Sequence, residues 1–357
     1  MRFVRIKNCK PGMIVARPLY GEYGVLLLSK GHLLTDRHIY ILKQRGFPGL
    51  YIFDEFSEGI KLEEMVVDDK MRRIAISGMK ELFDKATNVS QTKNQEVCNI
   101  ISNIVYDIVD TVFEANPSVL SVPLLKSFDE HTYQHSVEVG ITSIMMGKNM
   151  NMTKQDVLNL GMAAFFHDVG KIFVPKSILN KRSKLTRDEF NIMKLHPEWG
   201  FDFAKEVLGL PPVVIEGMLY HHERFDGTGY PRKLKGEQIP LFARIISVAD
   251  VFDALGSSRV YKKARLTTEG YGYIMTSAGR QFDPDIVDAF TKTITPFPTG
   301  LTVKLSNGLH AVVVRNNPNF MTRPFVCAFD PTGFKEHEYI DLANEMSAMG
   351  IEIAGIV

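Results

Sequence analysis

The spacing of hydrophobic positions changes along the chain from short runs to helical stripes and back to short runs. Residues 1–60 hold brief apolar stretches around Val4, Val15 and Leu27, separated by turns rich in glycine, proline and lysine. This pattern is typical of short strands and predicts a small β-rich unit. Within it, Thr35 as an N-cap and Gly46 as a stop predict one short helix.

Residues 61–120 are predicted to be a helical connector. Between Val97 and Phe113, apolar residues recur at three- and four-residue steps, which gives a wide apolar stripe on one face of a helix. Packing against a core is the more common use of such a stripe. A homodimer formed through this connector is a secondary hypothesis.

Residues 121–295 show mostly helical spacing, and residues 296–357 return to strands. Thr153 and Thr186 are expected to start helices, the latter with Glu189 in a capping box. Asn307-Gly308 is a typical hairpin turn between two predicted strands. The predicted fold class is mainly α, with an all-helical core and small β-rich segments at the N- and C-termini.

Composition narrows the classes of protein that fit. The 357 residues include 42 basic and 41 acidic ones, so nothing indicates a surface for a DNA or RNA polymer. No stretch approaches the ~18 consecutive apolar residues of a membrane span, and the first residues lack a secretory signal. Three scattered cysteines, Cys9, Cys98 and Cys327, indicate a reducing compartment. We therefore expect a cytoplasmic protein.

Candidate chemistry is concentrated in the helical segment. Six of the ten histidines lie between His131 and His222, and several adjoin a carboxylate. Imidazole and carboxylate ligands together suit divalent iron, manganese, cobalt, nickel or zinc. A polar network in the core is the alternative interpretation, but so many histidines beside carboxylates favour a metal site.

The doublet His167-Asp168 favours a site with two ions, because a carboxylate can bridge two metals and an imidazole cannot. Two ions ~3.5–4 Å apart can clamp a phosphoryl group. His221-His222 could likewise serve different ions. This constellation suits hydrolysis of a phosphoester better than redox chemistry.

Two motifs together resemble those of the HD-GYP family, bacterial cyclic di-GMP phosphodiesterases of the HD hydrolase superfamily. His167-Asp168-x-Gly170-Lys171 is followed 54 residues later by the run HHExxDGxGYP, which extends from His221 to Pro231. The resemblance covers about residues 125–290. It implies that residues 121–295 form an HD-GYP catalytic domain between the β-rich accessory segments 1–60 and 296–357.

The resemblance implies specific roles. Asp168, as the bridging ligand, and Lys171 would be catalytic. The substrate would contact Lys171, Tyr230, Arg259 and Lys262. Two or three divalent ions, most plausibly iron and alternatively manganese, would be held by His135, His167, Asp168, His196, His221, His222 and Asp250.

Some positions leave alternatives open. Three-metal members of the family carry glutamate where this chain has His131, so the number of ions is open. Tyr230 could instead be core packing, and Arg259 and Lys262 could be a solvated basic patch. Glu223 is expected to hold a ligating histidine.

The expected activity is metal-dependent hydrolysis of cyclic di-GMP to pGpG, with further hydrolysis to GMP left open. One alternative is a non-enzymatic receptor for a cyclic dinucleotide. Another is a phosphodiesterase for hybrid cyclic GMP-AMP or for pGpG. The signal sensed by residues 1–60 is not indicated by the sequence.

Overall fold

Both ends of the chain contribute to one compact unit, and the helical middle forms a second. The computed structural model describes residues 1–21, 25–54, 57–58, 66–85, 91–115, 120, 131–181, 183–256, 267–330 and 338–357. The first unit combines residues 1–65, 119–131 and 294–357, and the second combines residues 66–118 and 132–293. The four-segment division expected from the sequence stays a prediction about functional domains.

The N-terminal part of the first unit contains two small sheets and a helix. An antiparallel sheet has the order β1-β5-β2, with β1 at Arg2–Arg5, β5 at Gly49–Phe53 and β2 at Ile14–Val15. A hairpin pairs β3 (Leu19–Tyr20) with β4 (Leu26–Leu28). Helix α1 (Asp36–Gln44) begins after Thr35, whose hydroxyl accepts a hydrogen bond from the backbone N–H of His38.

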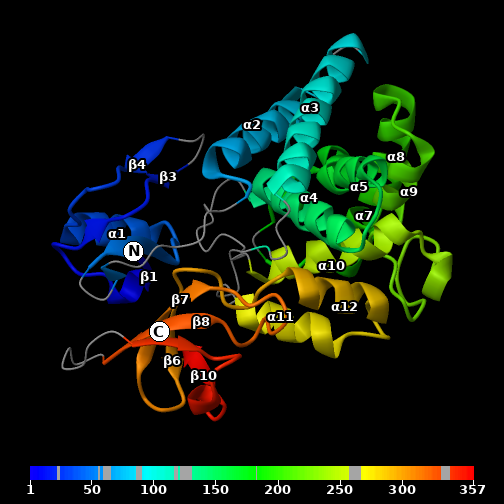
Figure 1. Ribbon diagram of the computed structural model, residues 1–357. Helices are drawn as coiled ribbons and strands as arrows, with labels where there is room; N and C mark the ends of the chain where they lie inside the picture. The colour runs from blue at the N-terminus through cyan, green and yellow to red at the C-terminus, as the bar shows by residue number, and fades with distance from the viewer. Residues whose placement is uncertain are drawn as a thin grey trace. The chain divides into compact units, whose positions relative to one another are not determined.

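The C-terminal part of the first unit is a five-stranded antiparallel sheet (Figure 1). Its order is β10 (Ile353–Ile356), β6 (Thr302–Leu305), β7 (His310–Arg315), β8 (Phe325–Phe329) and β9 (Glu338–Asp341). The β6–β7 turn contains Gly308 at φ +90°, a conformation that glycine adopts without strain. The predicted Asn307-Gly308 turn is confirmed.

The two parts of this unit share a hydrophobic core. The backbone N–H of Phe3 donates to the carbonyl of Gly300 at 2.6 Å, and the Thr302 hydroxyl donates to the carbonyl of Phe3 at 3.0 Å. Phe3 and Tyr51 pack into the same buried cluster as the inward-facing side chains of the C-terminal sheet. Strand β1 therefore links the N-terminal sheet to strand β6.

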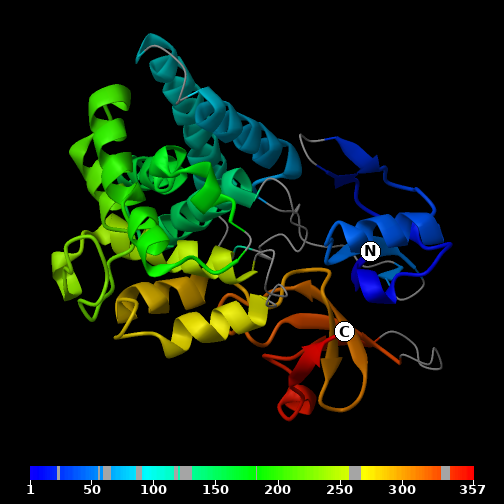
Figure 2. The same cartoon turned by 180° about the vertical axis from the view of Figure 1, so that it is seen from behind.

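The second unit is helical (Figures 1 and 2). Its helices are α2 (Asp69–Lys85), α3 (Gln91–Ala115), α4 (His131–Asn149), α5 (Lys154–Phe166), α6 (Lys176–Leu179), α7 (Arg187–Met193), α8 (His196–Phe203), α9 (Pro212–Leu219), α10 (Leu241–Gly256), α11 (Thr267–Thr276) and α12 (Pro284–Thr293). Short 3₁₀ or π turns in this unit span Val169–Phe173, Ala204–Leu208 and Gly236–Gln238, and the first unit has two more, Ile6–Asn8 and Met346–Ala348. The predicted mainly α fold class is confirmed.

The apolar stripe of the connector packs inside the helical unit. Val105, Ile108 and Val112 on α3 are fully buried, and α3 lies against α2 and α5. A Cβ atom at Gly161 of α5 would lie 2.9 Å from Val105, so the two helices approach closely at this glycine. The stripe thus serves the core, and dimerisation through the connector stays a prediction.

None of the described helices has both the length and the apolar character needed to cross a membrane.

Candidate metal centre

The seven predicted metal ligands come from five helices and the segments that follow them. His135 lies within α4 and Asp250 lies within α10. The other five lie at helix ends: His167 and Asp168 follow α5, His196 begins α8, and His221 and His222 follow α9. Helix ends let neighbouring residues such as His167 and Asp168 turn toward one point.

One group of side chains contains Asp168, His196, His221 and His222, whose potential ligand atoms all lie within 4.8 Å of one another. The Nε2 atoms of His196 and His221 lie 3.2 and 4.0 Å from Oδ1 of Asp168. The first three residues are buried, and the His222 side chain retains 25% of its exposure. One edge of this group therefore opens toward solvent.

A second group contains His135, His167 and Asp250, again with ligand atoms within 4.8 Å of one another. Nε2 of His135 lies 3.0 Å from Oδ1 of Asp250. The same nitrogen lies 3.8 Å from Oδ2 of Asp168, and Nε2 of His167 lies 3.3 Å from that oxygen. The Asp168 carboxylate thus points one oxygen at each group.

Three of the histidines are oriented by the same local hydrogen bond. In His167, His196 and His221, the Nδ1–H donates to the carbonyl of the residue three positions earlier, at 2.6–2.7 Å. A carbonyl only accepts, so the proton is fixed on Nδ1 and Nε2 is left with its lone pair. All three Nε2 lone pairs face Asp168.

The buried polar atoms at the centre lack protein partners. Nε2 of His167, His196 and His221 and Oδ1 of Asp168 are buried and accept no hydrogen bond. Unpaired buried acceptors are costly, whereas cations satisfy them. Imidazole nitrogens and carboxylate oxygens are ligands for divalent transition metals, so the residues present fit a divalent metal centre.

The electrostatics at the centre favour deprotonated ligands at most positions. Burial lowers the pKa of His222 to about 3, with His196 acting in the same direction. Burial alone would raise the pKa of Asp168, but Lys171 and His167 hold it well below its usual range. His135 differs, because its hydrogen bonds to two aspartates outweigh burial and raise its pKa to about 9. A metal ion would have to displace that proton.

Comparisons with known proteins agree with this geometry. Residues 120–286 match the model of the HD domain family. The chain is 37% identical to the cyclic di-GMP phosphodiesterase PA4108 of Pseudomonas aeruginosa over 64% of this chain and 55% of that protein. It is 43% identical to the cyclic di-GMP phosphodiesterase response regulator RpfG of Xanthomonas campestris over 42% of this chain and 39% of that protein. Residues 120–286 are therefore similar to HD domains, and the relatives support the assignment of this region to the HD-GYP type.

A third relative is named for another substrate. The 3'3'-cGAMP-specific phosphodiesterase 2 of Vibrio cholerae is 42% identical over 35% of this chain and 24% of that protein. In all three comparisons the matched region is less than two thirds of the relative's own length.

The glycine of the HDxGK motif has a steric role. A Cβ atom at Gly170 would lie 1.9 Å from the carbonyl oxygen of His196 and 2.5 Å from the nitrogen of Gly200. Only glycine therefore lets the turn after Asp168 pack against α8. Lys171, at the end of the same turn, forms an ion pair with Oδ2 of Asp168. The HDxGK motif thus holds Asp168 next to Lys171 and lets α8, which begins at His196, pack closely against the turn.

Tyr230 of the GYP motif lies beside the metal centre. Its ring centroid is 4.8 Å from that of His222, and the Lys194 ammonium lies 6.0 Å from the Tyr230 ring. Burial raises the pKa of the Tyr230 hydroxyl, and Asp250 acts in the same direction. A neutral phenol and a lysine therefore stand near the more exposed side of the centre. Lys194 lies outside the HDxGK and HHExxDGxGYP motifs.

The prediction that Glu223 holds a ligating histidine is wrong. Its carboxylate accepts hydrogen bonds from the backbone N–H groups of Arg232 and Leu234, at 2.6 and 3.1 Å, instead of holding a histidine. Glu223 is buried, with 2% of its surface exposed. It therefore fixes the loop that carries Tyr230, and its proximity in sequence to His222 was misleading.

Asp253 has the role that the sequence analysis assigned to Glu223. Its Oδ2 lies 2.8 Å from Nδ1 of His135, and the residue is 4% exposed. The signal in the sequence was the spacing of Asp250 and Asp253, because residues three apart share a helix face.

Three predicted positions cannot be placed. The structure describes α4 from His131, but the side chain of His131 lies outside the described part of the chain. Arg259 and Lys262 fall in 257–266, which is also outside it.

Proposed function

We propose that this protein is a metal-dependent phosphodiesterase that hydrolyses cyclic di-GMP to linear pGpG. The observation that carries the proposal is the Asp168 carboxylate, whose two oxygens face two separate groups of candidate ligands. A carboxylate so placed is suited to bridge two cations, and paired cations suit phosphoester hydrolysis.

In this proposal the ions are held by all seven residues of the two groups, with Asp168 shared between them. Bound divalent ions would supply Lewis acidity and lower the pKa of a coordinated water from ~15.7 toward neutrality. Iron is the preferred metal, with manganese as the alternative. Imidazole ligands agree with both, and the donor set by itself does not separate them.

The protein's own groups would orient the substrate and balance its charge. Lys171 is held at Asp168 and would offset negative charge on the phosphoryl oxygens. Tyr230 would line the pocket beside His222, where a base or ribose can pack against its ring. Arg259 and Lys262 remain proposed contacts for the dinucleotide. Glu223 would keep the Tyr230 loop in position through its two backbone hydrogen bonds.

A second candidate substrate is hybrid cyclic GMP-AMP, because one relative is named a 3'3'-cGAMP-specific phosphodiesterase. The two dinucleotides share their phosphodiester ring, so the metal centre alone does not distinguish them. A cytoplasmic location and further hydrolysis of pGpG to GMP also remain part of the proposal.

The test is substitution of the proposed bridge. Asp168→Ala should abolish turnover of cyclic di-GMP and metal loading together, because both ligand groups lose their shared oxygen donor. Asp188→Ala removes an exposed carboxylate on α7 and should preserve both. Product formation is followed by chromatography, and metal content is measured by elemental analysis.

Retained turnover with normal metal content in Asp168→Ala would contradict the bridging role. Normal metal content in the unsubstituted protein without hydrolysis of either dinucleotide would instead favour a receptor. Measuring both substrates under the same conditions ranks cyclic di-GMP against cyclic GMP-AMP.

A further inference from the structure

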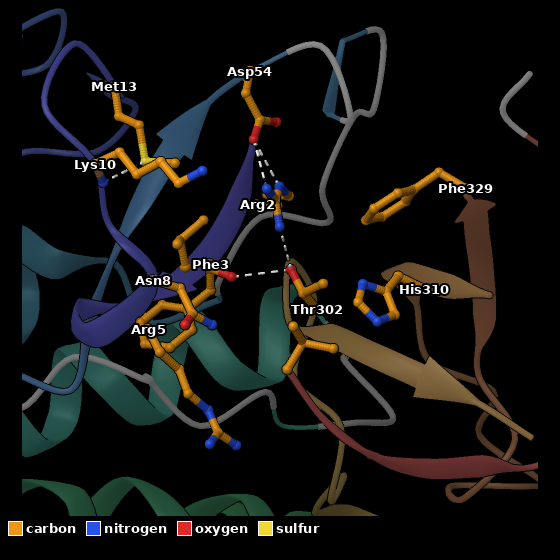
Figure 3. A pocket seen from close by; sticks show the side chains of 12 residues that line it. Arg2, Phe3, Arg5, Asn8, Lys10, Met13, Asp54, Thr302, His310 and Phe329 are labelled. Carbon is orange, nitrogen blue, oxygen red and sulfur yellow. Dashed lines mark hydrogen bonds and ion pairs between the residues drawn. The ribbon is translucent and has the colours of Figure 1, made fainter. Parts of the chain in front are cut away.

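A cavity of about 410 Å³ lies in the unit that contains both chain ends, far in sequence from every candidate metal ligand. Its walls come from β1 and the turn that follows it, from β6 and β7, and from the end of β8 (Figure 3). Sites for small molecules measure roughly 300–1,000 Å³, so the cavity has a suitable size.

Among the described residues that line this cavity, Asp54 is the only one with a carboxylate side chain, and it is paired with Arg2. Asp54 Oδ2 lies 2.8 Å from both Nε and Nη2 of Arg2. Nη1 of Arg2 also donates to the Thr302 hydroxyl at 3.4 Å, and the guanidinium lies 5.7 Å from the Phe329 ring. The Arg2 side chain is therefore held in a fixed orientation between Asp54, after β5, and Thr302 on β6.

The remaining charged side chains of the lining are basic. Lys10 is exposed, and its ammonium forms no ion pair with any residue in the described part of the chain. Arg5 donates to the carbonyl of Ile356 at 3.0 Å, which occupies one of its five N–H donors. With Arg2 and Asp54 cancelling, Arg5 and Lys10 leave the lining side chains with two positive charges, and the terminal carboxylate of Val357, which also lines the cavity, offsets one of them.

His310 lines the same cavity. Burial lowers its pKa, and the nearby cations Lys304 and Arg2 lower it further, while Asp330 opposes them. Figure 3 shows the His310 ring on the far side of Arg2 from Lys10, next to Phe329. Its ring centroid is 6.0 Å from that of Phe329. The His310 imidazole is therefore neutral near pH 7 and can take up a proton when an anion binds in the cavity.

We propose that this cavity is a binding site for a small phosphate-bearing ligand. Lys10 supplies a mobile ammonium and Arg2 a guanidinium fixed by Asp54, and both are common partners of phosphate oxygens. His310 supplies a third donor once protonated. Because the walls belong to the β1-β5-β2 sheet and to the five-stranded sheet, the ligand would tie the two chain ends together. This inference does not depend on the proposed hydrolase activity.

The test uses the full chain carrying Asp168→Asn, so that phosphate bound at the metal centre does not obscure the measurement. Inorganic phosphate and GMP are titrated separately, with guanosine as the uncharged control. Binding is measured by calorimetry, and the His310 imidazole signal is followed by nuclear magnetic resonance and assigned with His310→Gln. The two anionic probes distinguish free phosphate from a nucleotide as the source of the phosphate group.

Saturable binding of inorganic phosphate or GMP, with none of guanosine, is expected, together with an upward shift of the pKa of His310. Lys10→Glu should weaken the binding by about tenfold or more, because an attractive charge becomes repulsive. Lys7→Glu makes the same change at an exposed lysine outside the cavity lining and should leave the binding affinity unchanged. The proposal would be overturned if neither inorganic phosphate nor GMP bound saturably, or if the two lysine variants bound the anion equally well.

Discussion

The Asp168 carboxylate is buried, ion-paired with Lys171 and shared between two groups of imidazoles. Such a charge is expensive to bury unless several partners compensate it. The sequence allowed this residue and the six other proposed ligands to be named, because four of the seven stand in the HDxGK and HHExxDGxGYP motifs and the family resemblance implies the other three, His135, His196 and Asp250. It did not reveal Asp253, since an aspartate one helical turn after Asp250 can also be a solvated surface residue.

Asp253 provides a prediction that is separate from the ligands themselves. Asp253→Asn should lower the affinity for the metal about 10- to 100-fold, because the carboxylate that orients His135 becomes a weaker, neutral partner. Competition with a chelator measures the affinity. Asp288→Asn alters an exposed aspartate on α12 and is the matched control. Equal affinities in the two variants would show that Asp253 does not position His135.

His310 gives a prediction about pH. Its pKa is lowered in the folded protein from the ordinary value of 6.5. Below pH 6.5 the His310 imidazole therefore binds a proton more readily in the unfolded chain than in the folded one. This group therefore contributes a loss of stability as the pH falls below 6.5. Denaturant unfolding at about pH 7.5 and about pH 5.5 should show a smaller loss in His310→Gln than in the unsubstituted protein. Equal losses in His310→Gln and in the unsubstituted protein would contradict the assignment.

At the scale of elements, helix starts were predictable where a side chain caps the backbone locally. Thr35, Thr153 and Thr186 each accept a hydrogen bond from the backbone N–H three residues later, as their sequences predict. Strands β9 and β10 were not predicted, because their positions depend on pairing with β8 and β6 more than on their own short sequences.

A buried ion pair fixes the connector helix to the helix that carries His135. Arg72 on α2 contacts both oxygens of Glu138 on α4, and the two residues are 5% and 3% exposed. Phe83 on α2 also packs edge-on against Tyr133 of α4, with ring centroids 5.3 Å apart. The two contacts lie on either side of His135 in the α4 sequence.

Breaking this pair should be costly. Arg72→Met should reduce the free energy of unfolding by about 3–5 kcal/mol, because Glu138 is left buried without its partner. The double variant Arg72→Met, Glu138→Leu should recover most of that loss, since it removes both charges. Chemical denaturation of the metal-loaded protein measures the difference. A double variant no more stable than the single one would indicate that repacking, and not the isolated charge, sets the cost.

At the scale of the whole molecule, the sequence predicted the mainly α fold class but not that the two chain ends share a core. That association depends on contacts such as the one between Phe3 and Gly300, which are almost the whole chain apart in sequence. Local spacing carries no information about contacts at such separation. The helical unit was easier to recognise because its motifs and apolar stripes are local.

The central claim is that the two groups of ligands around Asp168 hold neighbouring metal ions that support hydrolysis of a cyclic dinucleotide. The most direct measurement combines elemental analysis of anaerobically purified protein with chromatography of its cyclic di-GMP reaction. We expect at least two divalent ions per chain, pGpG as a product, and loss of both in Asp168→Ala. One ion or none per chain in a sample that fully hydrolyses cyclic di-GMP would contradict the claim.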